Sequence, residues 1–284
     1  MVKKRSRYNS IRSISCGIVC YETPPSHLEN LLKSLVIAIQ RLHTTQRTIS
    51  VVIYVIDNSI KQTNLGASCE ELNNLEAENI RIRYVGGHGN IGYGAAQNLA
   101  ITSVNSDLHL ILNPDVTVKE DALVEGIKAF FSCPSLAILS PRAENNMGEK
   151  QFLCKRFPAV LTLLIRGFLP RSARGLFRKR LDHYEMRELS ETTLTEGIPL
   201  VSGCFMLSDT NLLQDLGGFD GGYFLYFEDF DLSLRMRSLG TLAYCPNVQI
   251  THAGGYVAKK GLFHIWQFLK SGIRFFNKHG WRYW

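Results

Sequence analysis

Apolar and polar residues alternate along the first half of the chain in blocks that predict β-strands and α-helices in turn. Residues 49–56 (ISVVIYVI) are nearly all apolar, which is typical of a parallel strand buried on both faces. Residues 26–42 repeat their apolar positions with helical periodicity. Further strands are expected at residues 15–21, 80–85, 109–112 and 136–140, and further helices at 65–75, after the glycines near 90, and at 120–131. This alternation predicts an α/β fold with a mainly parallel central sheet, flanked by helices, that binds ligands at the carboxyl ends of its strands.

The second half departs from this alternation in two places. Residues 144–197 are polar, then apolar, then strongly basic, and we interpret them as a variable insert within a domain that spans residues 1–255. Residues 256–284 follow as a C-terminal segment with an amphipathic helix predicted from about 261 to 278. One face of that helix is apolar and another is basic; the apolar face carries Leu262, Trp266, Leu269, Ile273 and Phe276, and the basic face carries Lys270, Arg274 and Lys278.

The distribution of charge says more than the net charge of +7. Nine lysines and arginines and no acid lie between Glu149 and Asp182, and no carboxylate side chain follows Asp231. Such segments indicate an anionic partner or simply a solvated basic face. Apolar residues beside the basic ones, with tryptophans at the end of the chain, favour an anionic membrane surface, although both segments could also be helices that pack on the core. Nucleic acid is not expected, because no recognition module is visible.

The same composition limits where the protein is expected to work. No run of eighteen apolar residues predicts a membrane-spanning helix, and the basic N-terminus lacks the features of a secretory signal. The seven cysteines are scattered and never spaced as C-x-x-C, which favours reduced thiols over disulfides or a zinc site. We therefore expect a cytoplasmic protein that is peripheral on the inner face of the cell membrane.

A glycine-rich loop at residues 87–92 (GHGNIG) matches the G-x-G-x-x-G fingerprint of dinucleotide-binding enzymes. That fingerprint normally follows the first strand of the fold, whereas two strand–helix units precede this loop. The next strand ends in LNPD, where proline forces an extended turn that aims Asp115 outward. A single outward carboxylate suits a metal–phosphate site better than a ribose contact, so we interpret the fingerprint as accidental.

When the loop is instead aligned from Asn90, it begins a series of motifs that resembles those of a known family. The motifs are N-x-G-x-G-x-x-x-N at 90–98, LNPD at 112–115, VSGCFM at 201–206, GGFD at 217–220, YFEDFDL at 226–232 and ITH at 250–252. In this order, over roughly residues 14–255, they resemble family 2 glycosyltransferases of the bacterial rhamnosyltransferase type. The resemblance implies the GT-A fold and an inverting, metal-dependent transfer of L-rhamnose from dTDP-L-rhamnose. The implied acceptor is a cell-envelope glycan or a lipid-linked saccharide of the lipopolysaccharide or O-antigen type.

The resemblance also implies a metal site. Transfer from a nucleotide diphosphate requires neutralisation of the leaving phosphates, which a hard cation such as Mg²⁺ or Mn²⁺ supplies through oxygen ligands. Asp115 matches the metal ligand, although this chain has Asn-Pro-Asp where the broader fold has D-x-D. His252 matches a position that contacts the metal or the diphosphate; a packed or surface imidazole is the alternative for that residue.

Asp229 matches the family's catalytic base. The surrounding aromatic residues are expected to limit water around the carboxylates, which raises the basicity of the one that is poorly solvated. Asp231 is expected in the first turn of the following helix, where a negative charge is favourable. Glu228 is expected to contact the substrate.

The remaining expected substrate contacts come from several strand ends. Asp57 resembles the residue that holds the base or ribose of the nucleotide, and the others are Tyr21, Glu22, Asn90, Gly92, Asn113 and Gly203. The family more often has asparagine at the position of Glu22. Three other classes stay open: a catalytically inactive nucleotide-sugar or glycan-binding subunit, a nucleotidyltransferase and a nicotinamide oxidoreductase. Intact Asp115 and Asp229 argue against the first, and the lack of a basic glycine-rich loop after the first strand argues against the second.

Overall fold

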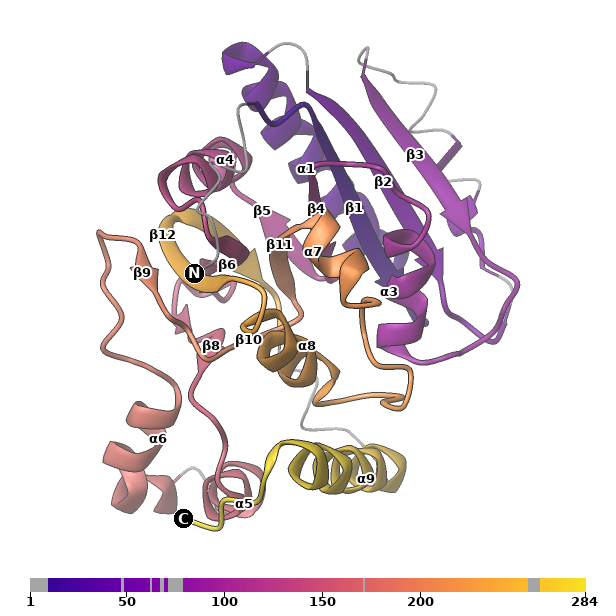
Figure 1. Cartoon of the computed structure of the whole chain (residues 1–284). Helices are drawn as coiled ribbons and strands as arrows, with labels where there is room; N and C mark the ends of the chain where they lie inside the picture. The colour runs from indigo at the N-terminus through magenta and orange to yellow at the C-terminus, as the bar shows by residue number, and fades with distance from the viewer. Residues whose placement is uncertain are drawn as a thin grey trace.

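A mixed β-sheet forms the centre of the molecule, which is described by a computed structural model (Figure 1). The structure describes residues 10–46, 49–61, 63–66, 69–70, 79–170, 172–254 and 261–284. The strands are β1 (Ser13–Cys20), β2 (Ser50–Asp57), β3 (Ile80–Val85), β4 (Leu108–Leu112), β5 (Val116–Val118), β6 (Leu136–Glu144), β7 (Lys150–Gln151), β9 (Thr195–Glu196), β11 (Phe205–Asp209) and β12 (Thr241–His252). Their order is β3-β2-β1-β4-β11-β6-β12-β5, with β7 beside β6 and β9 beside β12.

Strands β3, β2, β1 and β4 are parallel neighbours, as the β–α alternation predicts. Beyond β4, the sheet is mixed. Strand β11 lies antiparallel between β4 and β6, and β5 is antiparallel to β12, whereas β6 and β12 are parallel. Among the described strands, four of the seven pairings along the main path are therefore parallel. After the insert, the chain re-enters the centre of the sheet as β11, whose residues are all buried. This strand joins the two halves of the domain.

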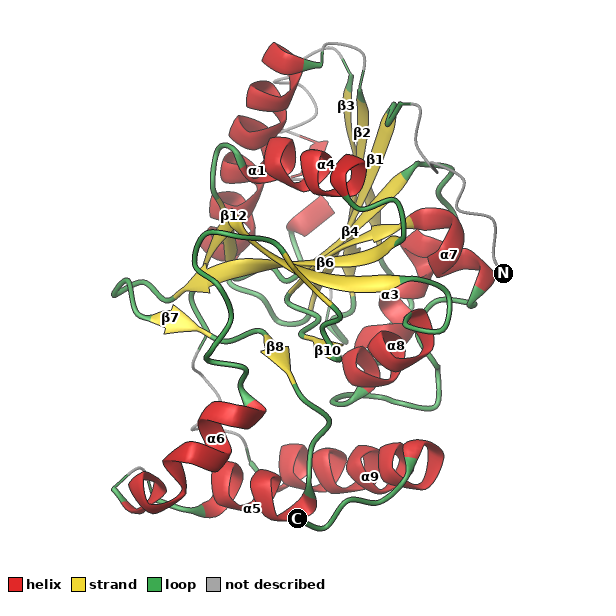
Figure 2. Ribbon diagram, turned by 60° about the vertical axis from the view of Figure 1, so that its left-hand side comes forward, coloured by secondary structure: helices red, strands yellow, loops and turns green. Residues whose placement is uncertain are grey.

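Helices cover both faces of this sheet, as Figure 2 shows. They are α1 (Pro25–Thr45), α3 (Tyr93–Ile101), α4 (Ala122–Ser132), α5 (Val160–Phe168), α6 (Arg178–Tyr184), α7 (Thr210–Asp215), α8 (Glu228–Met236) and α9 (Leu262–His279), with a 3-10 turn η1 at Ala173–Phe177. Consecutive strand residues serve opposite faces: Ile18 packs in the cluster that includes α1 and α4, and Val19 packs in the cluster that includes α3. The helix expected at 65–75 falls largely outside the described residues.

The insert and the C-terminal segment pack against each other and against α8. A short two-stranded sheet, β8 (Cys154–Lys155) with β10 (Leu200–Val201), leads from the insert to the domain centre. Helix α5 receives the end of the chain, because the N–H of Val160 donates to the Arg282 carbonyl at 2.8 Å. Phe157 and Val160 then pack with Phe275 and Phe276 of α9 in one aromatic cluster. The expected boundary between 255 and 256 lies at residues outside the described ranges.

Some apolar side chains of helix α9 are buried in the protein, and others are exposed to solvent. Phe276 is buried, whereas Leu262 is 85% exposed, Trp266 56% and Ile273 51%. These four residues therefore do not share one packing face. No helix among the described residues is long and apolar enough to cross a bilayer.

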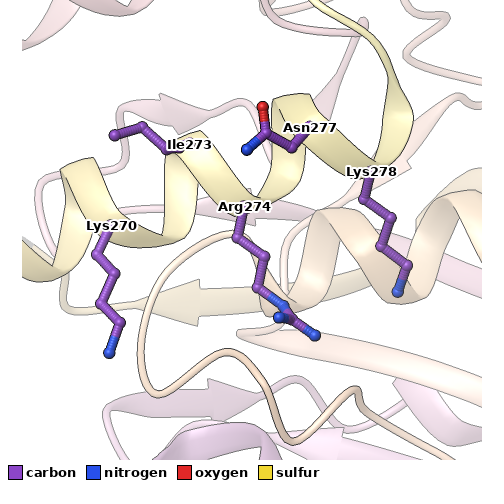
Figure 3. Close-up of a pocket in the computed structure, with 5 residues that line it drawn as sticks. All are labelled: Lys270, Ile273, Arg274, Asn277 and Lys278. Atoms are coloured by element: carbon purple, nitrogen blue, oxygen red, sulfur yellow. The ribbon is translucent and has the colours of Figure 1, made fainter.

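The expected basic face of α9 is present, but most of it serves contacts within the molecule. Figure 3 shows Lys270, Arg274 and Lys278 on one side of the helix, beside a shallow pocket that Ile273 and Asn277 also line. Arg274 and Lys278 contact the Asp220 carboxylate at 3.1 and 2.8 Å, and these pairs lower its pKa against the effect of burial, which would raise it. Lys270 lies over the Trp266 ring, 5.0 Å from its centroid.

Candidate active site

The carboxyl ends of three neighbouring strands meet at one edge of the sheet. Cys20 of β1 pairs with Asp57 of β2, and Ile18 pairs with Leu112 of β4. Residues that follow these strands therefore lie close together, as expected for a parallel sheet. The residues after β4 are held by a hydrogen bond from the Asn113 N–H to the Cys204 carbonyl at 3.0 Å, which places that turn beside the start of β11.

Asp57 is a buried carboxylate with a full set of donors. Its Oδ1 accepts the Ser59 N–H at 3.1 Å, and its Oδ2 accepts the hydroxyls of Tyr84, at 3.0 Å, and of Thr63. Burial alone would raise the pKa of Asp57, but these hydrogen bonds outweigh it and lower the pKa. Asp57 is thus an ionised acceptor at the strand edge, fixed in orientation by its neighbours.

Tyr21 and Glu22 follow β1 at the same edge. Tyr21 is about half exposed, and Glu22 has a positive φ of 46°, which is uncommon outside glycine. The Glu22 N–H donates to Ser59 Oγ at 3.0 Å, so one serine supports both strand ends. Both side chains are accessible to a ligand.

Asn90 and Gly92 shape the glycine-rich loop through internal contacts. Asn90 Oδ1 accepts from Asn58 Nδ2 at 3.0 Å and from the Gly92 N–H at 3.1 Å. Gly92 has a φ of 89°, and a Cβ there would lie 2.6 Å from the Phe224 carbonyl oxygen. Glycine is needed at this position for close backbone packing, which brings the loop against the segment that precedes α8.

Asp115 and His252 lie side by side because of strand pairing. His252, at the end of β12, pairs with Val116 of β5, the residue that follows Asp115. The imidazole Nε2 lies 3.4 Å from Asp115 Oδ2, and Nδ1 lies 2.7 Å from Gln151 Oε1. Burial would raise the pKa of Asp115, but the contact with His252 lowers it. The imidazole is partly accessible and faces the carboxylate.

The two side chains fit a divalent cation that takes most of its ligands from substrate and water. One carboxylate oxygen and one imidazole nitrogen face each other, and the pKa of Asp115 favours its ionised form. The described residues contain no group of three or more histidine, cysteine or acidic side chains that could enclose a metal. Hard cations bound through one or two protein ligands plus phosphates match such an open set.

Asp229 is the second residue of helix α8 and is held from the turn between β10 and β11. The Gly203 N–H donates to Asp229 Oδ2 at 3.0 Å, and the Phe230 N–H donates to Oδ1 at 2.8 Å. A Cβ on residue 203 would lie 3.2 Å from Asp229 Cβ, so a glycine allows this approach. The Tyr93 hydroxyl donates to the Gly203 carbonyl at 2.9 Å and so fixes the same turn.

Glu228 and Asp229 form an acidic pair in which Glu228 is buried and Asp229 is partly exposed. Burial raises the pKa of both, and repulsion from Asp229 raises that of Glu228 further, while N–H donors oppose the rise at Asp229. Glu228 Oε2 is buried and has no hydrogen-bond partner among the described residues. The negative charge is therefore stabilised on Asp229 and the shared proton on Glu228.

The backbone before this pair is strained. Tyr226 and Phe227 have positive φ values of 69° and 65°, and such non-glycine residues cost on the order of 1–3 kcal/mol each. Phe227 is buried against Phe268, Phe275 and Phe276 of α9. Packing by α9 thus holds the turn that aims the two carboxylates.

Asp231, two residues further on, lies in the first turn of α8, as expected. Its fully buried carboxylate contacts Arg235 at 2.6 Å, and Lys278 and His279 at 2.7 Å. These contacts lower its pKa although burial alone would raise it. Asp231 thereby ties α8 to α9.

A pocket of about 720 Å³ joins the two halves of the site. His252, Asp229 and Glu228 line it together with residues of the insert and of α9, among them Gln151, Lys155, Arg166, Tyr184 and Phe268. The insert residues, and Tyr93 behind the pocket, are absent from the sequence-based expectations. The run of nine cations indicates that the insert is basic, but no local pattern shows which of them face the catalytic carboxylates.

Comparison with known proteins is consistent with this arrangement. The chain is 27% identical over 245 residues to the N-acetylglucosaminyl-diphospho-decaprenol L-rhamnosyltransferase of Mycobacterium tuberculosis, which covers 81% of this chain and 73% of the relative. It is also 27% identical over 181 residues to rhamnosyltransferase WbbL of Escherichia coli K12, covering 60% and 63% of the two chains.

Solved structures share the fold at low sequence identity. GalNAc-T7 with UDP, GalNAc and Mn²⁺ aligns with a TM-score of 0.62 at 16% identity, over 85% of this chain and 43% of that chain. The mannosyltransferase PcManGT of Pyrobaculum calidifontis, with GDP-Man and Mn²⁺, aligns with a TM-score of 0.59 at 15% identity, over 92% and 61%. The chain thus spans less than two thirds of each of these proteins, and the likeness shows the GT-A fold.

A family model described as "Glycosyltransferase like family 2" matches residues 12–262. That range contains every strand and both carboxylates, Asp115 and Asp229, that the site geometry singles out. The chain belongs to glycosyltransferase family 2.

Proposed function

We propose that this protein transfers L-rhamnose from dTDP-L-rhamnose, with inversion, to a hydroxyl of a lipid-linked saccharide of the cell envelope. The observation that carries the proposal is the shared pocket in which Asp229 and His252, the neighbour of Asp115, lie. The names of the two relatives support rhamnose as the sugar, and the Mycobacterium tuberculosis relative is named for a lipid diphosphate acceptor.

Asp229 acts as the general base. As the acceptor oxygen forms its bond to the anomeric carbon, the bond from that carbon to the diphosphate oxygen breaks and the diphosphate takes the electron pair. The acceptor hydroxyl gives its proton to Asp229, whose basicity is raised by burial. The N–H groups of Gly203 and Phe230 keep Asp229 in one orientation. Glu228, protonated beside it, can donate a hydrogen bond to the acceptor sugar.

Asp115 and His252 are the residues that would hold a divalent cation, Mg²⁺ or Mn²⁺. Such a cation neutralises charge on the leaving diphosphate. Two solved neighbours contain Mn²⁺, which supports metal dependence as part of the proposal. Asn113 lies in the same turn, and Asp57, Tyr21 and Glu22 lie along the strand edge, where they would contact the nucleotide.

The protein works at the inner face of the cell membrane, with an anionic bilayer against α5, η1 and α9. Exposed apolar side chains gather on these elements and on the end of the chain: Leu161, Leu164, Leu176, Phe177, Leu262, Phe263, Ile265, Trp266, Leu269, Ile273, Trp281, Tyr283 and Trp284. Exposed cations, including Lys179 and Lys270, accompany them, and α9 contains no acid. Apolar residues with cations are the combination that binds anionic lipid surfaces.

A screen of donor hydrolysis tests the reaction. The protein is incubated with dTDP-L-rhamnose and with UDP- and GDP-sugars, with and without Mn²⁺, and Asp229→Asn is the matched control. We expect hydrolysis of dTDP-L-rhamnose that requires the cation. Binding of donors without hydrolysis, and without transfer to any acceptor in a broad panel, would instead favour a catalytically inactive nucleotide-sugar-binding subunit. Use of another nucleotide sugar in place of dTDP-L-rhamnose would assign a different donor.

A further inference from the structure

Three cations of the insert converge on one carboxylate at the pocket that contains Asp229. Nitrogen atoms of Lys155, Arg166 and Arg187 lie 3.9, 3.6 and 2.7 Å from Glu185 oxygens. Glu185 is their common partner, and Arg187 also contacts Asp182, which in turn pairs with Arg178. Four cations thus share two carboxylates, so the cluster carries excess positive charge.

Lys155 is the buried member of this cluster. Its side chain is 7% exposed, and its Nζ donates to the Phe152 carbonyl and lies 5.7 Å from the centroid of the Tyr184 ring. A buried ammonium group is costly unless it is paired, and the nearest carboxylate is 3.9 Å away. Its surroundings are therefore those of a cation that lacks a close anion.

Two further polar atoms along the same pocket have no partner. The Tyr184 hydroxyl and Glu228 Oε2 are buried and make no hydrogen bond within the described part of the chain. Both residues line the pocket with Lys155, Arg166 and Asp229. Buried polar atoms are rarely left unsatisfied, so these two indicate a polar ligand between the cations and the catalytic carboxylate.

The cluster and the base are joined by a short rigid connection. Lys155 pairs with Leu200, and Cys154 pairs with Val201, in the sheet of β8 and β10. Two residues beyond Val201, the Gly203 N–H holds Asp229. The position of Lys155 relative to Asp229 is therefore set by backbone pairing.

We propose that Lys155, Arg166 and Arg187 form an acceptor subsite that binds the diphosphate of a lipid-linked saccharide, while the hydroxyl of its sugar faces Asp229. This inference rests on the proposed function, which gives the acceptor its class. The donor diphosphate is assigned to Asp115 and His252, which are separate residues from this cluster. Arginine and lysine are the residues that recognise phosphate oxygens through charge-assisted hydrogen bonds.

The protonation of Lys155 on ligand binding can be measured as uptake of protons from the buffer. Burial and then repulsion from Arg166 lower the pKa of Lys155 to about 7. An arriving diphosphate favours the charged ammonium and raises that pKa. At pH 8, where the free site holds Lys155 mostly neutral, binding is therefore accompanied by proton uptake.

Binding is measured by titration calorimetry of inorganic pyrophosphate without divalent cations, at pH 8, in buffers of different ionisation enthalpy. We expect Arg166→Gln to weaken binding about tenfold, as loss of one charge-assisted contact implies. Lys155→Met, which keeps the buried volume, should reduce the proton uptake, and the uptake that remains belongs to Glu228, whose pKa of about 8 also rises beside an anion in this pocket. Lys179→Gln is the control, because Lys179 is an exposed cation of the same insert. Circular dichroism verifies that each variant is folded.

Two outcomes overturn the subsite. The first is equal affinity for pyrophosphate in wild type, Arg166→Gln and Lys155→Met. The second is a loss of dTDP affinity in these variants that is as large as their loss of pyrophosphate affinity, because that result would assign the cluster to the donor. In transfer assays, the KM for a prenyl diphosphate-linked saccharide should rise in Arg166→Gln and keep the wild-type value in Lys179→Gln. Absence of all sugar transfer by the wild type contradicts the proposed function alone, since calorimetry judges the subsite separately.

Discussion

The N–H of Gly203 donates a hydrogen bond to Asp229 Oδ2, and this contact joins the strand that leaves the insert to the helix that begins with the acidic pair. Glycine permits it, because a side chain at position 203 would press on Asp229 Cβ. The two acids of the pair differ in their hydrogen bonds. Asp229 accepts from backbone N–H groups, whereas Glu228 Oε2 has no partner among the described residues. Asp229 is therefore the member of the pair that stays ionised and available to accept a proton.

Asp229→Asn is expected to abolish most sugar transfer while donor binding persists. The amide keeps the shape of the side chain but cannot accept a proton, so the rate should fall by about 10²–10⁴. Initial rates and dTDP-sugar affinity are measured together. Transfer at the wild-type rate would show that another carboxylate is the base.

The rate of transfer is expected to fall on acidification, because protonation of Asp229 removes the base. Its pKa is raised by burial, so the loss should occur at a higher pH than for an exposed aspartate. Glu228→Gln should leave this acid limb in place, because Glu228 is already protonated where Asp229 titrates. An acid limb that disappears in Glu228→Gln would assign the base to Glu228.

Glu228→Gln is also expected to stabilise the fold at high pH. Burial and the neighbouring Asp229 raise the pKa of Glu228 above its unfolded value, so the folded state favours the protonated acid and loses stability as pH rises. The variant should gain on the order of 1 kcal/mol or more at pH 9 and less at pH 6. Urea unfolding at both pH values measures this difference, and equal effects would contradict the buried acid.

Asp115→Asn is expected to weaken donor binding and turnover together. Asp115 provides the carboxylate at the proposed cation site, and only His252 would remain beside it. The dependence of the rate on Mn²⁺ concentration should shift to higher values by about tenfold or more. Unchanged metal dependence and turnover would remove Asp115 from the metal site.

Membrane binding is expected to depend on Trp266 and Lys270 more than on the other cations of α9. Arg274 and Lys278 are engaged by Asp220, so replacing them would disturb the helix as well as its charge. Trp266→Ser with Lys270→Gln should reduce sedimentation with anionic vesicles more than with neutral vesicles, because the contribution of the tryptophan does not depend on lipid charge and that of the lysine does. Each exposed cation near such a surface contributes about 1 kcal/mol. Wild-type sedimentation of the double variant would contradict docking through this face.

Residues at strand ends were predictable because parallel pairing brings them to one edge. Asp57 and Asp115 follow apolar runs that could only be buried strands, so their approximate positions follow from local pattern. Lys155 and Tyr184 were not predictable, because two two-residue strands and a short helix bring them to Asp229. Such elements have no periodicity long enough to recognise. The split of α9 into a packed face and an exposed face likewise depends on Asp220 and Phe227, which lie far away in the sequence.

The strained turn at Tyr226 and Phe227 has a consequence for engineering. Every residue assigned to chemistry lies before residue 255, yet Phe227 is held by aromatic residues of α9. A chimaera that exchanged the C-terminal helix for that of a relative would retain the whole catalytic sequence and lose the surface that was matched to Phe227. The two parts have to be exchanged as a set, together with α5, because α5 and α9 share that aromatic cluster.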